Sequence, residues 1–410
     1  MCNYIKAIKV NQVRHLRDFV IDVVDKTNPA DGPVHLMLTG RNGCGKTSML
    51  KYLVEHLKTN ARSSVTLSKL REIRDMYLRL LQQAVTEEKR LEYKRGLLEN
   101  QKREREWVQH VEIVTENELL FHEQLKSREL LVAYYPAQRI SKFSQPNAPQ
   151  LIEVGPTQDI QSSRATTFLM FLVHLKAQRS MLRDEGKEEA AEAINTWFIK
   201  FENILRSVFN DKQLKLDFNP GNYEFTIISR EQQSPLTALA DGYAALLDIV
   251  ADLILKMQSQ GKLCADFNQP GIVLIDEVET HLHMELQALV MPLLTSLFPN
   301  IQFIVTTHSP FVLSSIENAL AFDLETQQPL DNADEYSYDS LAEGFFGVQI
   351  QPDIVRRHFE RLNELIEKTD KTEDERKEQA SLINLLKRIP KHANAALNTA
   401  MKQLLLRHHL

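Results

Sequence analysis

The sequence has few cysteines and no long hydrophobic run. Three cysteines, Cys2, Cys44 and Cys264, are too few for a disulfide framework, and their spacing does not fit a paired metal-ligand motif. No apolar stretch approaches the ~20 residues that a helix needs to span a bilayer, and the first residues do not have the pattern of a signal peptide. We therefore expect a soluble, cytoplasmic protein that does not contact a membrane.

The sequence also lacks an excess of basic residues. Its 49 lysines and arginines against 55 acidic residues give a formal net charge of −6, so nucleic acid would have to bind a local basic patch. Apolar residues make up 43% and charged residues 25% of the 410 positions, a balance typical of a protein with a buried core. The length fits one large domain with insertions, or two domains.

A glycine-rich loop follows an apolar segment near the N-terminus. The stretch "LTGRNGCGKTSML" (38–50) contains Gly40, four further residues, and then Gly45, Lys46 and Thr47, which fits the phosphate-loop pattern. The segment before it predicts a buried strand, and the segment after it predicts a helix. Glycine lets backbone N–H groups turn toward phosphate, the lysine can reach the β- and γ-phosphates, and the threonine hydroxyl can bind Mg²⁺. The pattern favours a nucleotide site over a chance glycine turn.

Two further apolar segments end in residues suited to nucleotide hydrolysis. In "GIVLIDE" (271–277), Asp276 can hold Mg²⁺ through water and Glu277 can polarise an attacking water as general base. The alternative, a strand that ends by chance in two acids, is disfavoured by the phosphate loop upstream. In "IVTTHSP" (304–310), His308 could hydrogen-bond the γ-phosphate and the attacking water. A lone histidine at a strand end is usually structural, but its order and spacing after the two acids favour a role in the site.

A turn of small residues opens the predicted helix in "LADGYAALLDIVADLI" (239–254). Such a helix start, here at Gly242, is a second place where an anion could bind. One phosphate cannot contact both helix starts within one subunit, but it can where two copies of the chain face each other.

Residues 65–107 have a different composition from the rest of the chain. They include no proline, one glycine, and eleven lysines and arginines against eight acidic residues, a local net charge of about +3. Apolar residues at three- and four-residue steps predict helices with a narrow apolar stripe. Because the chain must leave the core and return, we expect a helical hairpin or coiled-coil arm. This arm could contact DNA or a partner, or it could be a solvated pair of charged helices.

Strands and helices are expected around these motifs. Alternating apolar residues predict two strands at a sheet edge within 1–40, and residues 110–117 and 130–139 predict strands that return to the sheet. Further along, the expected elements are helices over 164–209 with a break near 183–189, strands at 214–219 and 223–229, a helix at 241–259, a strand at 271–277, a helix at 282–297, strands at 302–307 and 321–325, and three amphipathic helices from about 351 to the end. This alternation predicts an α/β fold with helices on both faces of a sheet.

The motifs "GRNGCGKT", "LADGY", "LIDE" and "TTHSP" resemble, in this order, those of the ATP-binding-cassette (ABC) ATPases. "LIDEVETHLHMELQ" and "THSPFVLSS" are similar to the SMC-, RecF- and OLD-like branch, and above all to the ATPase subunits of Septu-type or retron-associated Septu-like anti-phage defence systems. The resemblance implies an ABC ATPase head, with a mixed sheet flanked by helices, over 1–350. This head would be interrupted by the helical arm at 65–107 and a helical subdomain at 160–210, and 351–410 would form a C-terminal helical region.

The resemblance also implies ATP and Mg²⁺ as cofactors and assigns roles to single residues. Glu277 and His308 would act in catalysis, and Thr47, Asp276 and Gln138 would hold Mg²⁺. The residues that would contact the nucleotide are Gly40, Arg41, Asn42, Gly43, Cys44, Gly45, Lys46, Thr47, Ser48, Gln138, Ala240, Asp241 and Gly242. Because the family usually has a serine where this sequence has Ala240, only backbone donors would remain there, and hydrolysis could be slow.

The expected partners follow from what the resemblance includes and what the sequence does not contain. A head-to-tail dimer around two ATP molecules, or a higher oligomer, is implied, together with a separate HNH nuclease, because no Toprim, HNH or PD-(D/E)xK pattern follows residue 325. Glu279, His281 and His283 could form a metal site, but their place after Asp276 favours a dimer interface. Two other functions stay open: a slowly hydrolysing ATP-bound scaffold that sequesters an effector, and a DNA-repair ATPase of the RecF or SMC type.

Overall fold

The computed structural model describes residues 3–23, 32–139, 143–150, 160–161, 163–230, 233–258, 267–330, 353–368 and 370–387. The chain divides into two compact units, Met1–Tyr336 and Ser337–Leu410. The domain division predicted near residue 350 falls within 331–352, outside the described residues. Within the described ranges, none of the helices has both the length and the apolar content to cross a membrane.

The core of the first unit is a six-stranded sheet, counted over the described residues, with the order β12-β11-β3-β10-β9-β5. Its five neighbouring strands from β11 to β5 run parallel, and β12 pairs antiparallel with β11 at one edge. The bounds are β3 His35–Thr39, β5 Leu131–Tyr135, β9 Gly271–Ile275, β10 Ile301–Thr306, β11 Ala319–Asp323 and β12 Gln328–Leu330. All residues of β3, β9 and β10 are buried, as in parallel strands covered on both faces. The sheet confirms the predicted α/β class.

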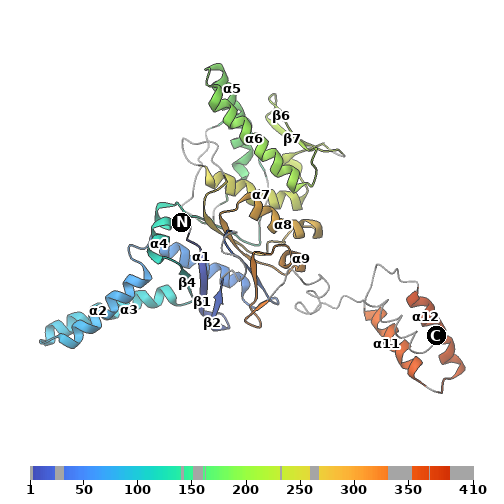
Figure 1. Cartoon of the computed structure of the whole chain (residues 1–410), viewed down its shortest axis with the longest axis horizontal. Coiled ribbons are helices and arrows are strands. Elements are labelled where there is room, and N and C mark those ends of the chain that lie inside the picture. Colours follow the sequence, from blue (N-terminus) through green and yellow to red (C-terminus); the bar gives the residue numbers. More distant parts are fainter. Residues whose placement is uncertain are drawn as a thin grey trace. The chain divides into compact units, whose positions relative to one another are not determined.

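Helices cover both faces of this sheet (Figure 1). On one face, α1 (Lys46–Arg62) and α4 (Glu118–Ser127) belong to the same apolar cluster as Leu36, Leu274 and Ile304 of the sheet. Residues that alternate with these along the strands point to the other face, where α7 (Asp241–Met257), α8 (Met284–Leu297) and the short α9 (Pro310–Leu313) lie. The central sheet therefore has the two covered faces that its continuous apolar strands require.

The N-terminal strands form a second sheet, and here one expectation was wrong. Three strands, in the order β2-β1-β4, pair antiparallel in a sheet of their own instead of extending the central one; they are β1 Ile5–Val13, β2 Leu16–Asp22 and β4 Val111–Thr115. Buried residues that recur along β1 give the sheet one covered face, which packs on α1. Of the segments expected to return to the central sheet, only β5 does so, at the edge beside β9.

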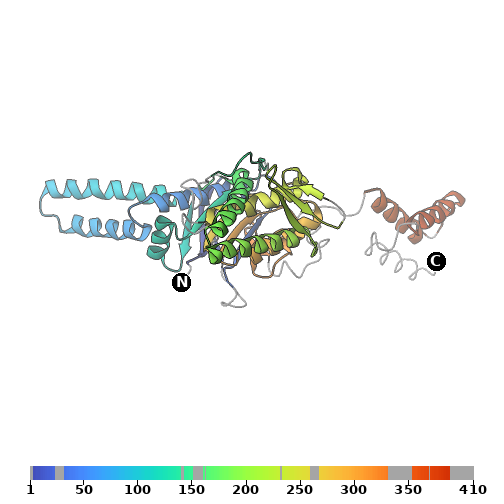
Figure 2. The same ribbon diagram turned by 90° about the horizontal axis from the view of Figure 1, so that it is seen from above.

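The arm leaves the first unit between α1 and β4 as two antiparallel helices, α2 (Leu67–Gln83) and α3 (Glu87–Val108) (Figure 2). Thr66 and Thr86 cap them, each hydroxyl accepting from the backbone N–H three residues on. The chain turns at residues 84–86, which the sequence did not locate. Gly96 lets the helices approach closely, because a Cβ there would lie 2.5 Å from the ring of Tyr77.

The base of the arm is attached to the helix that follows the phosphate loop and to β4. The rings of Tyr52 on α1 and His110 after α3 stack with centroids 3.8 Å apart. Nδ1 of His56, also on α1, lies 3.3 Å from the carbonyl oxygen of Trp107. Arg71 of α2 forms a two-pronged ion pair with Glu112 of β4, with its shorter contact at 2.8 Å. These contacts tie both arm helices to the core.

A helical lobe and a small third sheet follow β5. The helices are η1 (Ala165–Thr167), α5 (Phe168–Asp184) and α6 (Glu188–Val208), so the helix break falls within the predicted turn. The strands β6 (Lys215–Asn219), β7 (Glu224–Ile228) and β8 (Gln233–Pro235) pair antiparallel, and η2 (Leu236–Ala238) leads to α7. The aromatic rings of Phe168, Phe171, Trp197 and Phe201 pack together between the lobe's helices.

The described part of the second unit is a helix pair, α11 (Asp353–Glu367) and α12 (Glu373–Lys387). Leu362, Leu365, Ile366 and Leu382 are buried between them. Arg361 of α11 pairs with Glu378 of α12 at 3.1 Å. The third amphipathic segment, 395–410, lies outside the described residues.

Candidate nucleotide site

The glycine-rich loop connects the carboxyl end of β3 to α1. Gly40, Gly43 and Gly45 have φ values of 128°, 86° and 109°, a region that residues with a Cβ rarely adopt. A Cβ on Gly40 would lie 2.8 Å from Sγ of Cys44. The first turn of α1 contains neither an acidic residue nor a side-chain cap, so its backbone N–H groups are available to an anion.

Lys46 lies inside this loop. Its Nζ donates hydrogen bonds to the carbonyl oxygens of Gly40 (2.7 Å) and Arg41 (3.2 Å), and the residue is buried. Burial lowers the pKa of Lys46, while the nearby carboxylates of Glu277 and Glu279 favour its charged form. The ammonium group is therefore placed between the loop and the acidic turn after β9.

The carboxyl ends of three neighbouring strands bring the predicted magnesium ligands together. Asp276 follows β9 and is almost fully buried. Its Oδ1 accepts from Oγ1 of Thr47 at 3.2 Å and from Oγ1 of Thr306, at the end of β10, at 2.7 Å. Hydroxyl and carboxylate oxygens are the ligands that Mg²⁺ prefers. Thr47 and Asp276 therefore suit the binding of Mg²⁺ beside the phosphate loop.

Glu277 occupies a tight turn directly after Asp276. Its φ is 46°, an uncommon value for a residue other than glycine. Its backbone N–H donates to Oγ1 of Thr306 at 2.7 Å, and its Oε2 accepts from Oγ1 of Thr280 at 3.3 Å. The side chain is half-buried and interacts electrostatically with Lys46. The carboxylate thus faces the phosphate loop from a constrained backbone.

His308 lies in the same site, beyond the end of β10. Its backbone N–H donates to Oε1 of Glu279 at 2.6 Å. Burial lowers the pKa of His308, the charge of Lys46 lowers it further, and Glu277 opposes both effects. The neutral imidazole is therefore the favoured form, which can accept a hydrogen bond on one ring nitrogen and donate from the other.

The histidines that followed Asp276 in the sequence do not form a metal site with Glu279. Within the part of the chain that the structure describes, no group of three or more His, Cys, Asp or Glu side chains is placed to hold a metal ion. Instead, burial raises the pKa of Glu279, and its carboxylate holds the backbone at His308. The alternative metal site considered from the sequence is therefore not supported.

Gln138, the glutamine predicted to link Mg²⁺ to the helical part, follows β5 and is exposed. The next residue, Arg139, is buried. Nη1 of Arg139 donates to the carbonyl oxygen of Asp276 at 3.0 Å, and Nη2 donates to that of Glu277 at 3.2 Å. Sequence reasoning missed this residue. The available signal was an arginine in "YYPAQR", just beyond an apolar strand.

At the start of α7, the predicted contact residues divide into exposed and buried ones. Ala240, the N-cap, and Asp241 are exposed. Gly242 is buried, and a Cβ there would lie 3.1 Å from the carbonyl oxygen of His281 and 3.2 Å from Cδ1 of Leu286. Within this chain, Gly242 therefore serves the close packing of α7, and the accessible groups belong to the two residues before it.

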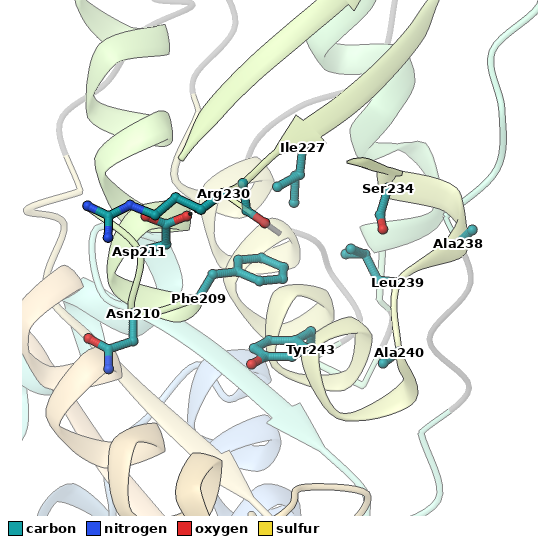
Figure 3. A pocket seen from close by; sticks show the side chains of 11 residues that line it. Phe209, Asn210, Asp211, Ile227, Arg230, Ser234, Ala238, Leu239, Ala240 and Tyr243 are labelled. Carbon is teal, nitrogen blue, oxygen red and sulfur yellow. Dashed lines mark hydrogen bonds between the residues drawn. The ribbon is translucent and has the colours of Figure 1, made fainter. Parts of the chain in front are cut away.

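A pocket of about 640 Å³ lies beside this helix start (Figure 3). Phe209, at the end of α6, and Tyr243, in the first turn of α7, stack with ring centroids 4.3 Å apart. Arg230 and Asp211 line one side of the pocket, and Leu239 and Ala240 line the other; the remaining lining residues are Asn210, Ile227, Ser229, Ser234 and Ala238. The pocket was not predicted from the sequence.

A parallel sheet with a glycine loop, an uncapped helix start, a buried lysine and a Thr–Asp pair at its carboxyl edge defines the phosphate-loop class of nucleotide-binding domains. The chain belongs to the family described as "AAA domain, putative AbiEii toxin, Type IV TA system", whose profile matches residues 36–314.

Several named proteins are similar in sequence to parts of this chain. The chain is 34% identical over 116 residues to "Retron Vc95 probable ATPase" of Vibrio cholerae serotype O1 biovar El Tor, covering 28% of this chain and 22% of that protein. It is 30% identical over 168 residues to "Septu protein PtuA" of Bacillus mycoides (strain KBAB4), covering 38% and 23%. It is 40% identical over 81 residues to "Retron Ec83 probable ATPase" of Escherichia coli, covering 20% and 15%. The matches thus span less than a quarter of each relative's length.

Among solved structures, an SMC head bound to the C-terminal winged-helix domain of ScpA aligns with 78% of this chain and 94% of its own, at 12% identity. The TM-score is 0.36, which is too low to define a shared fold.

Proposed function

We propose that this protein binds ATP with Mg²⁺ at the carboxyl edge of its central sheet and hydrolyses it. The observation that carries this proposal is the hydrogen-bonded set of Thr47, Asp276 and Thr306 beside Lys46. It places a hydroxyl and a carboxylate for Mg²⁺ next to a cation and a helix start for the phosphates. The family match and the relatives named as ATPases support the same activity.

The residues of the site would divide the chemistry between binding and water activation. Lys46 would exchange its contacts with the loop carbonyls for the β- and γ-phosphates. Thr47 and Asp276 would hold Mg²⁺, with Gln138 reaching the ion from the segment after β5. Glu277 would act as general base, and neutral His308 would orient the water and the γ-phosphate. The rest of the loop would hold the phosphates through backbone N–H groups; its members are Gly40, Arg41, Asn42, Gly43, Cys44, Gly45 and Ser48.

The test compares nucleotide binding with hydrolysis in matched variants. We expect Glu277→Gln to keep its affinity for a fluorescent ATP analogue while phosphate release falls about 10²- to 10⁴-fold, because the general base is lost. Lys46→Ala should weaken binding by about 10- to 100-fold, the effect of losing hydrogen bonds to a charged group. Glu123→Gln, on the exposed side of α4, is the control. Unchanged phosphate release by Glu277→Gln would refute the assignment.

We further propose that two copies close head to tail around two ATP molecules. The exposed Ala240 and Asp241 leave the start of α7 accessible to the γ-phosphate bound by a second copy. Light scattering on a sizing column should show Glu277→Gln doubling in mass with ATP and Mg²⁺, whereas Lys46→Ala should not. A Glu277→Gln protein that binds ATP and keeps its mass would contradict this dimer.

The relatives suggest a biological setting. Since they are named Septu and retron proteins, we propose that the ATPase acts in anti-phage defence and gates a separate nuclease of the HNH type. Purification of the tagged protein from its native host should recover such a nuclease in stoichiometric amounts. Recovery of replication or repair proteins instead would favour a RecF- or SMC-like role on host DNA.

Two other functions have specific observations in their favour. Ala240 lacks the serine hydroxyl that ABC ATPases usually have at this position, which favours a scaffold that binds ATP and hydrolyses it slowly. Tight ATP binding with turnover far below 1 s⁻¹ would support this function.

The arm carries exposed cations near its turn, which favour contact with DNA phosphates; they are Arg79, Lys89, Arg90, Lys94 and Arg95. If replacing these five residues with glutamine does not weaken DNA affinity, the arm is excluded as a DNA-binding surface.

A further inference from the structure

The turn that carries Glu277 needs support from outside its own segment. A φ of 46° is costly for a side chain with a Cβ, and such a conformation persists only where neighbouring groups hold it. Thr306 holds the turn from one side by accepting the Glu277 N–H at 2.7 Å. Within the turn, the backbone N–H of Thr280 donates to the carbonyl oxygen of Glu277 at 2.9 Å.

Arg139, which follows β5, supplies further donors from a distant segment. Its guanidinium group donates to three successive carbonyl oxygens, at 3.0 Å to Asp276, 3.2 Å to Glu277 and 3.5 Å to Val278. Such a set matches the planar fork of an arginine and cannot be reproduced by the single ammonium group of a lysine. Arg139 therefore joins Thr306 and the Thr280 N–H in holding the Glu277 backbone, and it alone of the three spans all three carbonyl groups.

An acidic side chain of α7 interacts electrostatically with Arg139. Arg139 is 9% exposed, and burial lowers its pKa; among the carboxylates that oppose this effect, Asp248 of α7 contributes most. One turn further along α7, Asp252 accepts from the Tyr135 hydroxyl at 2.6 Å and pairs with Lys256. A buried polar network thus connects the end of β5, which carries Arg139, with the helix that begins beside Ala240.

We propose that Arg139 is the positioning residue that fixes the Glu277 carboxylate for hydrolysis, and that Asp248 couples it to the start of α7. This inference rests on the proposed ATPase function. A second copy or a nucleotide that shifts the start of α7 would move Asp248, and through Arg139 it would move the turn that carries the general base. The proposal predicts a defect in turnover that leaves nucleotide binding intact.

The test measures turnover, nucleotide affinity and thermal unfolding side by side in full-length variants. Arg139→Met and Arg139→Lys should lower kcat by about 100-fold, the loss that follows a displacement of about 1 Å in a catalytic group. Affinity for a fluorescent ATP analogue should stay within about threefold of wild type, because the phosphate loop is not altered. Arg183→Met, at an exposed position of α5, is the matched control and should retain wild-type kcat.

The coupling to α7 has its own test in a double-mutant cycle. Asp248→Asn should lower kcat in the wild-type background and add no further loss in the Arg139→Met background, because the two residues act through one path. The single variant Asp248→Asn also keeps the proposal testable if Arg139→Met does not fold. Losses that multiply in the double variant would overturn the coupling.

The remaining outcomes separate the two proposals. If wild type hydrolyses ATP and Glu277→Gln does not, retained kcat in Arg139→Met overturns the role of Arg139 alone. Parallel losses of kcat, affinity and unfolding temperature would also overturn it, because they indicate a general structural role. Absence of hydrolysis in wild type would overturn the ATPase function on which the inference rests.

Discussion

Asp248→Asn should make the protein more stable at neutral pH and leave its stability at pH 4 almost unchanged. Asp248 is 7% exposed, and burial raises its pKa from 3.8 to about 6, with the charge of Asp252 adding to this effect. Arg139 and Lys256 oppose the rise without cancelling it. The ionised carboxylate is therefore less favourable in the folded chain than in the unfolded chain.

The sign and the size follow from proton linkage. Because the folded pKa lies above the unfolded one, the folded state binds the extra proton, and wild-type stability falls as pH rises from about 4 to about 6. At 1.36 kcal/mol per pKa unit, the difference between 3.8 and about 6 corresponds to about 3 kcal/mol. Asparagine resembles the protonated form, so the variant should gain up to about 3 kcal/mol above pH 7 and only about 0.5 kcal/mol at pH 4.

Urea unfolding at pH 4, 5, 6, 7 and 8 would measure this difference, with Asp241→Asn, at an exposed position of the same helix, as the control. A gain that does not change with pH would show that the carboxyl charge is not its cause. A loss of stability at pH 7 would show that Asp248 is a net stabilising partner of Arg139. With the turnover defect proposed above, the expected result is a more stable but slower enzyme, a trade-off common at functional sites.

Three further substitutions test single contacts. Gly40→Ala should abolish binding of a fluorescent ATP analogue without unfolding the chain, because its Cβ would lie 2.8 Å from Sγ of Cys44 at a φ of 128°; binding within twofold of wild type would contradict this. Gly96→Ala should destabilise the packing of the two arm helices by about 1 to 3 kcal/mol, because the added methyl group overpacks against Tyr77. Proteolysis within 65–107 should then be faster than in wild type, and an unchanged rate would mean that the Tyr77 ring moves aside freely. Thr306→Val should destabilise the fold by about 1 to 3 kcal/mol and slow phosphate release, because Asp276 loses one hydrogen bond and the Glu277 N–H is left unpaired. Thr306→Ser keeps the hydroxyl and should behave as wild type. Equal effects of the two changes would exclude the hydroxyl as the cause.

The central sheet could be predicted because its strands are continuous apolar runs, and because their carboxyl ends must meet at one edge. The phosphate-loop and "LIDE" motifs predicted that Thr47 and Asp276 serve the same ion, and the two side chains lie within hydrogen-bond distance. The reasoning from strand patterns failed for the strands at Ile5–Val13 and Val111–Thr115, since alternation shows that one face is covered but does not identify the pairing partner.

The missed parts of the site depend on packing between distant segments. Nothing in the order of Gln138 and Arg139 indicates which side chain turns inward, because that depends on three carbonyl groups 137 to 139 positions later. The burial of Gly242 depends likewise on the segment after Glu279. Local sequence supplies the chemistry of such residues, and the tertiary fold decides which of them reach the site.

The attachment of the arm to α1 has a mechanical consequence. One end of α1 meets the phosphate loop, and its middle turns contact the base of the arm through Tyr52 and His56. The 22 residues of α3 extend about 33 Å at 1.5 Å per residue. A tilt of about 10° at the base would therefore displace the far end by about 6 Å, so a rearrangement too small to disturb the core becomes a movement that a neighbouring molecule can register.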